Sequence, residues 1–215
     1  MSNSGLYDFI KIGGWSSSYS SHYESAWSCF YDYINYTKLL KVEEERIRNE
    51  ADIPEEHIEG FIHHKTENLH SEAYRSATSA HLYSCMAIEG FVNFYGTKRL
   101  GEDLFKPILE RIGITEKLSL IYLVCFEKRI LPSDKLLKDI RKIFEQRNSL
   151  VHPKTKEVTS ENFKNYLYVH PSQLEIGNAL KTLEMFIDSF CEMDKNINRN
   201  FHFNKPNKAN SLGKN

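Results

Sequence analysis

The sequence predicts an all-α fold. Apolar residues recur at spacings of three and four along several long windows, which is the period of an amphipathic helix. No proline interrupts the two longest windows, residues 22–48 and 71–95. Residues 166–169 form the only short run with β-forming side chains, and this run is equally compatible with a loop.

The first half of the chain contains the longest expected helices. Residues 1–21, which include a Ser-rich stretch, are expected to form an N-terminal arm, and a long helix follows over about 22–48. Pro54, followed by two glutamates, is typical of the start of another, short helix. The clearest helix covers 71–95, where one face carries small side chains that permit close approach of a neighbouring helix: Ala73, Ala77, Ala80, Ser84 and Ala87.

Shorter helices are expected in the second half. They cover 102–111, 115–128 and 133–151, and Ser133 is the expected N-cap of the third. A last helix opens at Pro171 and has an apolar face that reaches Phe190. Residues 196–215 contain basic but no acidic side chains, which predicts a disordered basic tail. A chain of 215 residues suits one domain, and residues 22–195 are expected to form it.

The composition is that of a globular protein of the cytoplasm. Hydrophobic residues make up 40% and charged residues 27% of the chain, so it is expected to fold by itself. The longest apolar run, 118–126, is about half as long as a transmembrane helix, and the N-terminus lacks the apolar stretch of a signal peptide. The four cysteines are widely spaced, which is typical of isolated thiols in a reducing compartment. No membrane partner is expected.

The net charge of −1 conceals two segments of opposite sign. Residues 42–61 carry eight acidic side chains against two arginines, whereas residues 135–156 carry seven basic side chains against Asp139 and Glu145. A polyanion would be attracted to the second segment. The alternative explanation of such a run is a solvated helix face.

Arg147 is the charged residue whose position is most unusual. It lies four residues after Ile143 and three after Phe144, so it shares the apolar face of its helix and needs an acceptor. Glu89 and Asn93, four residues apart in the 71–95 helix, are candidate supporting residues. We expect this helix to pack against 133–151 so that Glu89 orients Arg147. An internal ion pair that only fixes helix register is the alternative.

His152 follows Arg147 by five residues. Along an ideal helix the two side chains would point about 140° apart, so they can meet only if the chain breaks at Pro153. An imidazole and a guanidinium together suit phosphate chemistry, because one exchanges protons and the other stabilises negative charge on phosphate oxygens. RNA cleaved through its own 2′-hydroxyl would need no metal.

Two segments carry a resemblance to a known family. Arg147-Asn148-Ser-Leu-Val-His152 resembles the Arg-x4–6-His signature of the HEPN superfamily, and Ala87-Ile-Glu89-Gly-Phe-Val-Asn93 resembles its polar-bearing central helix. The resemblance covers residues 22–195. It implies an antiparallel helical bundle that dimerises around two copies of the signature. It also implies a metal-independent endoribonuclease in defence, toxin–antitoxin or RNA-processing systems, in which Arg147, His152 and Asn148 form the catalytic site.

The expected partners follow from this resemblance and from the basic stretch. RNA is the expected substrate, a second copy completes a homodimer, and an antitoxin or another regulatory protein is a further candidate partner. Three lysines are expected to bind the substrate: Lys142, Lys154 and Lys156. No cofactor or metal is expected, because the histidines near residues 63–70 have the wrong spacing for a common site. The alternative is a non-catalytic helical module that binds a partner protein or a nucleotide, with Arg147 fully paired to Glu89 and His152 buried.

Overall fold

Most of the described residues are helical. The computed structural model describes residues 18–50, 53–152 and 176–206, and no strand occurs within these ranges. The predicted all-α fold is therefore confirmed. The short run at 166–169 lies outside the described residues.

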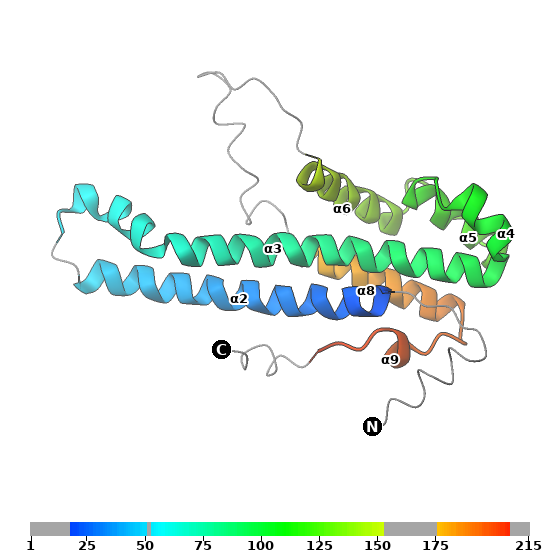
Figure 1. Ribbon diagram of the computed structural model, residues 1–215, viewed down its shortest axis with the longest axis horizontal. Coiled ribbons are helices and arrows are strands. Elements are labelled where there is room, and N and C mark those ends of the chain that lie inside the picture. Colours follow the sequence, from blue (N-terminus) through cyan, green and yellow to red (C-terminus); the bar gives the residue numbers. More distant parts are fainter. Residues whose placement is uncertain (1–17, 51–52, 153–175, 207–215) are drawn as a thin grey trace, which may run out of the picture.

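Two long helices, α2 (Tyr19–Glu50) and α3 (Glu55–Leu100), run antiparallel along each other (Figure 1). Pro54 is the N-cap of α3 and two glutamates occupy its first turn, as the sequence predicted. The helix then continues to Leu100. The short helix expected after Pro54 and the helix expected over 71–95 are therefore one element, because no proline or turn residue divides them.

Gly96 lies inside α3 and does not end it. A Cβ atom at this position would overlap the ring of Phe105. Glycine thus lets the ring pack directly against the helix backbone, and Phe105 is 1% exposed.

The helix expected over 102–111 is irregular. It consists of α4 (Glu102–Leu104) and a π-helical turn, η1 (Phe105–Leu109). Pro107 has no N–H to donate to the carbonyl four residues before it, so an α-helical ladder cannot continue there. Instead the N–H of Glu110 donates to the carbonyl of Phe105 at 3.0 Å, which is the π-helical pattern.

Three further helices pack against α3: α5 (Ile114–Phe126), α6 (Lys135–Val151) and α8 (Ile176–Met193). They occupy the expected regions, although residues 171–175 lie outside the described ranges. The N-cap of α6 is Asp134 and not Ser133. The Asp134 carboxylate accepts a hydrogen bond from the N–H of Leu131 at 2.8 Å, which closes the turn before the helix.

The core lies where α2, α3 and α8 meet. Phe91 of α3 packs edge-to-face against Phe186 and Phe190 of α8, with ring centroids 5.8 and 5.3 Å apart. Tyr19 of α2 also packs edge-to-face against Phe91, with ring centroids 5.3 Å apart. Residues 19–21 were expected in the N-terminal arm. They belong to α2 instead, because the Tyr19 ring is buried in this core.

The chain after α8 returns to the core through α9 (Arg199–His202). Phe203 is 3% exposed, and its ring lies 5.1 Å from that of Phe91. Arg199 forms ion pairs with Glu184 and Asp188 of α8. Residues 196–206 therefore differ from the expected disordered tail, because a buried aromatic ring and two ion pairs hold them. Residues 207–215 lie outside the described ranges.

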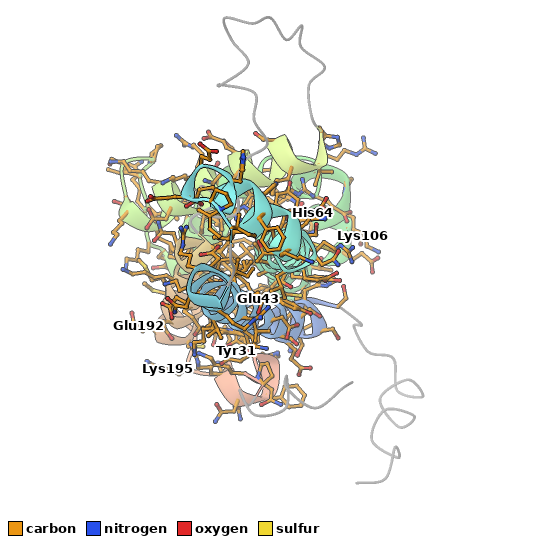
Figure 2. All side chains as sticks on the ribbon, turned by 90° about the vertical axis from the view of Figure 1, so that its left-hand side faces the viewer. Tyr31, Glu43, His64, Lys106, Glu192 and Lys195 are labelled. Carbon is orange, nitrogen blue, oxygen red and sulfur yellow. The ribbon has the colours of Figure 1, made fainter. Side chains whose placement is uncertain are left out.

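The end-on view shows the order of the elements, from α6 through α3 and α2 to α9 (Figure 2). Glu43 of α2 and His64 of α3 lie at the end of the long helix pair that faces the viewer. Among the helices that the structure describes, none combines the length and apolar character needed to cross a membrane.

Candidate functional site

A polar ridge on α3 faces the neighbouring helices. It consists of His81, Cys85, Glu89 and Asn93, which are spaced four residues apart and therefore follow one row along the helix surface. Sequence reasoning identified the last two members only. His81 and Cys85 are buried, whereas Glu89 and Asn93 are partly exposed. The ridge thus leads from the interior towards solvent.

The buried end of the polar ridge holds α6. Nε2 of His81 lies 2.8 Å from the carbonyl oxygen of Ile143, and the Cys85 thiol donates to the same oxygen at 3.6 Å. A carbonyl oxygen only accepts, so Nε2 carries the proton of this hydrogen bond. Burial lowers the pKa of His81 and raises that of Cys85 to about 12, which keeps both groups uncharged.

Arg147 lies one turn after Ile143, beside the exposed end of the polar ridge. Its Nη2 is 3.9 Å from Oε2 of Glu89, and its Nη1 donates to Oδ1 of Asn148 at 2.9 Å. The expected packing of the two helices is confirmed. The Arg147 side chain is 31% exposed and that of Glu89 39%, so the expected buried position of the guanidinium is corrected. A long side chain at the edge of an apolar face can reach water with its charged end.

Lys117 of α5 is the buried cation of this region, and sequence reasoning missed it. It is 2% exposed, and its ammonium donates to Oδ1 of Asn93 at 3.0 Å. Burial lowers the pKa of Lys117, while the charges of Glu89 and Glu110 act in the opposite direction. Glu89 therefore has cations from two helices beside it, Lys117 from α5 and Arg147 from α6.

His152 is exposed at the end of α6. Its backbone N–H still donates to the carbonyl of Asn148 at 2.9 Å, so the helical path extends to its Cα atom. As predicted from Pro153, α6 ends at Val151, and His152 has non-helical backbone angles of φ −123° and ψ 67°. Within the described part of the chain, no hydrogen bond joins the His152 imidazole to Arg147.

The three lysines expected to bind substrate are only partly located. Lys142 lines a pocket between α6 and α8, on a different side of α6 from the Glu89 contact. Lys154 and Lys156 lie outside the described residues.

Metal-ligating side chains do not converge in the described ranges: no group of three or more His, Cys, Asp or Glu residues there could hold an ion. The rings of His63 and His70 are 5.9 Å apart on α3. The four cysteines are free thiols.

Comparisons with known proteins add no family to this geometry. The chain matches no protein-family model, no curated protein and no solved structure.

Proposed function

We propose that the protein is a metal-independent endoribonuclease of HEPN type that acts as a homodimer in the cytoplasm. The observation that carries this proposal is the state of Arg147: its guanidinium is partly exposed, held near Glu89 at 3.9 Å, and followed by an exposed imidazole at His152. A guanidinium held in this way can turn to a phosphate, and it offers the planar donor pair that phosphate oxygens accept.

The proposed reaction uses a nucleophile that RNA itself provides. An imidazole removes the proton of the 2′-hydroxyl, the 2′-oxygen attacks the adjacent phosphorus, and the bond from phosphorus to the 5′-oxygen breaks. An imidazolium returns a proton to the leaving 5′-oxygen. Arg147 stabilises the charge that develops on the phosphate oxygens. The products are a 2′,3′-cyclic phosphate and a 5′-hydroxyl, and DNA, which lacks the 2′-hydroxyl, is not a substrate.

A second copy would complete the site. The HEPN resemblance implies a cleft lined by the signature residues of two copies, and Arg147 and His152 both lie at the C-terminal end of α6, where two copies could meet. A two-fold axis near the end of α6 would bring the arginine of one copy towards the histidine of the other. It would also combine two basic stretches into one field for RNA.

The non-catalytic module is the second candidate, and the polar ridge favours it, because His81 and Cys85 fix the register of α6 without any chemistry. That interpretation, however, expected Arg147 fully paired and His152 buried. Both side chains are more exposed than it requires.

The proposal is tested by incubating the purified protein with mixed RNA in EDTA. His152→Ala is expected to reduce cleavage by roughly 10²–10⁴-fold, and Arg147→Lys is also expected to fail because an ammonium lacks the planar fork. Matched controls are His64→Ala and Arg141→Lys, two exposed residues of the same types away from the site. Absence of RNA cleavage by the wild-type protein under all conditions, or equal cleavage of single-stranded DNA, would contradict the proposal.

The shared site has its own test. Arg147→Ala and His152→Ala proteins, each inactive alone, are mixed and allowed to exchange subunits. If each site takes its arginine and histidine from different copies, mixed dimers contain one intact site, and roughly a quarter of wild-type activity returns. No recovery despite exchange, or a monomeric mass for active protein by light scattering, would rule out the composite site.

A further inference from the structure

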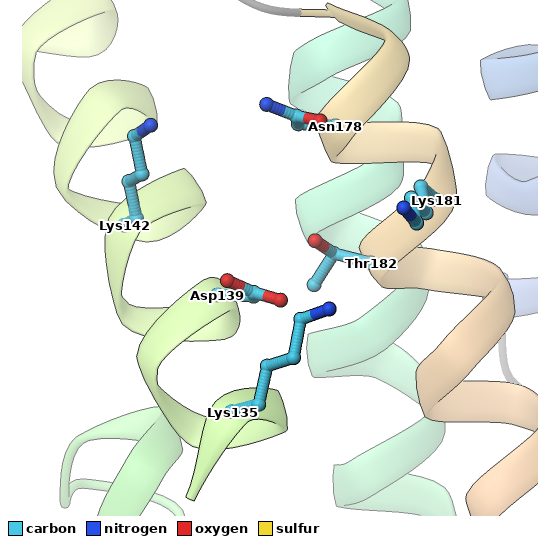
Figure 3. Close-up of a pocket in the computed structure, with 6 residues that line it drawn as sticks. All are labelled: Lys135, Asp139, Lys142, Asn178, Lys181 and Thr182. Carbon is cyan, nitrogen blue, oxygen red and sulfur yellow. The ribbon is translucent and has the colours of Figure 1, made fainter. Parts of the chain in front are cut away.

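A polar pocket lies between α6 and α8. Its volume is about 150 Å³, and Figure 3 shows side chains of the two helices facing each other across it. The α6 side is formed by Lys135, Asp139 and Lys142, and the α8 side by Asn178, Lys181 and Thr182. Because a water molecule occupies about 30 Å³ in the liquid, the pocket has room for a tetrahedral anion such as a phosphate group.

The lining of this pocket has the chemistry of an anion site. It contains three ammonium groups against one carboxylate, so its formal charge is positive. Thr182 is only 3% exposed, and its hydroxyl points into the gap between the helices (Figure 3). A hydroxyl in such a place can donate a hydrogen bond to a phosphate oxygen.

The pocket is separate from the proposed cleavage site. Lys135, Asp139 and Lys142 follow each other at spacings of four and three, so they share one face of α6. Arg147, five residues after Lys142, lies about 140° further round the helix and contacts α3 instead of α8. An anion in the pocket would therefore bind beside the cleavage site and not in it.

We propose that this pocket is a binding site for a phosphate group. The group belongs either to a small phosphate ester, such as a nucleotide, or to the backbone of a bound RNA. The chemistry is the same in both cases, since ammonium groups attract the phosphate and the Thr182 hydroxyl donates to it. This inference does not depend on the proposed nuclease activity.

The test measures binding of two probes at constant ionic strength. Sodium pyrophosphate and a short RNA are titrated separately into the His152→Ala protein, which leaves the pocket intact and prevents cleavage by the proposed mechanism. Lys135→Gln and Lys181→Gln are each expected to weaken binding by roughly 10-fold, the lower end of the effect of one charged hydrogen bond, because both lysines are exposed. Thr182→Val, which keeps the shape, is expected to weaken it by roughly 3–10-fold. Lys138→Gln removes one charge from an exposed position of α6 outside the pocket and should change binding by less than about 2-fold.

The outcomes separate the two sources of the phosphate. Binding of pyrophosphate that depends on the pocket supports a small phosphate ester, and pocket-dependent binding of RNA alone supports the backbone. Neither result requires RNA cleavage, so failure of the nuclease proposal would leave this one standing. No binding of either probe at millimolar concentration would overturn the inference. It would also be overturned if Lys138→Gln weakened binding as much as the pocket variants, since that would show a diffuse charge effect.

Discussion

Replacing Glu89 by Gln shows which of its two neighbouring cations the carboxylate stabilises. The pair with Arg147 joins two partly exposed side chains across 3.9 Å. Pairs of this kind contribute about 0–1 kcal/mol to stability. The position expected from sequence, on a buried face, would have led to roughly 3–5 kcal/mol for loss of the partner. Because the side chains of Arg147 and Glu89 are both partly exposed, the larger value does not apply.

Lys117 is the cation that depends more on Glu89. Because Lys117 is 2% exposed, its ammonium cannot regain water when the carboxylate is neutralised. Members of one polar network couple by about 0.5–3 kcal/mol. Glu89 itself is partly exposed, so screening by solvent places the coupling near the lower end, about 1 kcal/mol. In a domain of this size, 1 kcal/mol changes Tm by about 2–4 °C.

Lys117→Met is the second variant needed to measure the coupling between Glu89 and Lys117. It removes the buried charge and retains much of the side-chain volume. Relief of the buried charge offsets the lost hydrogen bond to Asn93, so the expected change in stability is within about 1 kcal/mol of zero.

The assay is urea unfolding at pH 7 of the wild type, Glu89→Gln, Lys117→Met and the double variant. Glu89→Gln is expected to lose about 1–2 kcal/mol, and the loss should fall by about 1 kcal/mol in the Lys117→Met background. The same cycle with Arg147→Gln is the matched control and should show coupling in the lower half of the 0–1 kcal/mol range, at most about 0.5 kcal/mol, because the two side chains are partly exposed and 3.9 Å apart. Equal losses from Glu89→Gln with and without Lys117 would refute the reasoning.

Three further predictions follow from the core and the polar ridge. Phe91→Ala should destabilise the fold by about 3–5 kcal/mol in urea unfolding, because Phe91 packs against rings of α2, α8 and the segment that follows α9. Gly96→Ala should destabilise the fold by about 1–3 kcal/mol, because the added Cβ overlaps the Phe105 ring. Phe105→Leu in the Gly96→Ala background should recover part of this loss. No recovery would contradict this packing. Burial lowers the pKa of His81, so the folded chain binds its proton more weakly than the unfolded chain. The contribution of His81 to the free energy of unfolding should therefore fall as pH decreases below 6.5 and remain constant above it. NMR should show that His81 titrates below 6.5. Titration at or above that value would contradict its neutral buried state.

The presence of the helices could be predicted, because their apolar period extends over many turns. The residues at which the helices begin and end could not be predicted. Local patterns divided α3 at about residue 70, although nothing in the chain there stops a helix. Gly96 is an instructive case, because glycine near the end of a helical pattern usually ends it. Here it admits the Phe105 ring, a contact that depends on tertiary packing. The prediction of a disordered C-terminal tail was wrong for the same reason. The stretch is mostly polar, but the buried ring of Phe203 holds it against the core, and that contact depends on tertiary packing.

The candidate site could be predicted where one helix period relates its residues. Glu89 and Asn93 are four apart, and that spacing was sufficient to place them on one face of α3, where Glu89 lies beside Arg147 of α6 and Asn93 contacts Lys117 of α5. Lys117 could not be found in this way, because a lysine in an amphipathic helix is usually on the solvated face. Its burial arises from how α5 packs on α3. A possible signal was its place directly before Leu118, which begins an apolar run.

The polar ridge determines the position of Arg147 but not that of His152. The carbonyl of Ile143, which accepts from His81 and Cys85, is also the α-helical acceptor for the N–H of Arg147. Buried contacts to α3 therefore fix the turn of α6 that carries the guanidinium. His152 lies more than one turn further on, and its exposed imidazole has no hydrogen-bond partner in the described part of the chain. If the histidine takes part in catalysis, something outside this arrangement must orient it, and the candidates are a second copy of the chain and the RNA itself. The subunit-mixing experiment distinguishes them, because RNA alone would orient the histidine within one copy and would not restore activity between two inactive variants.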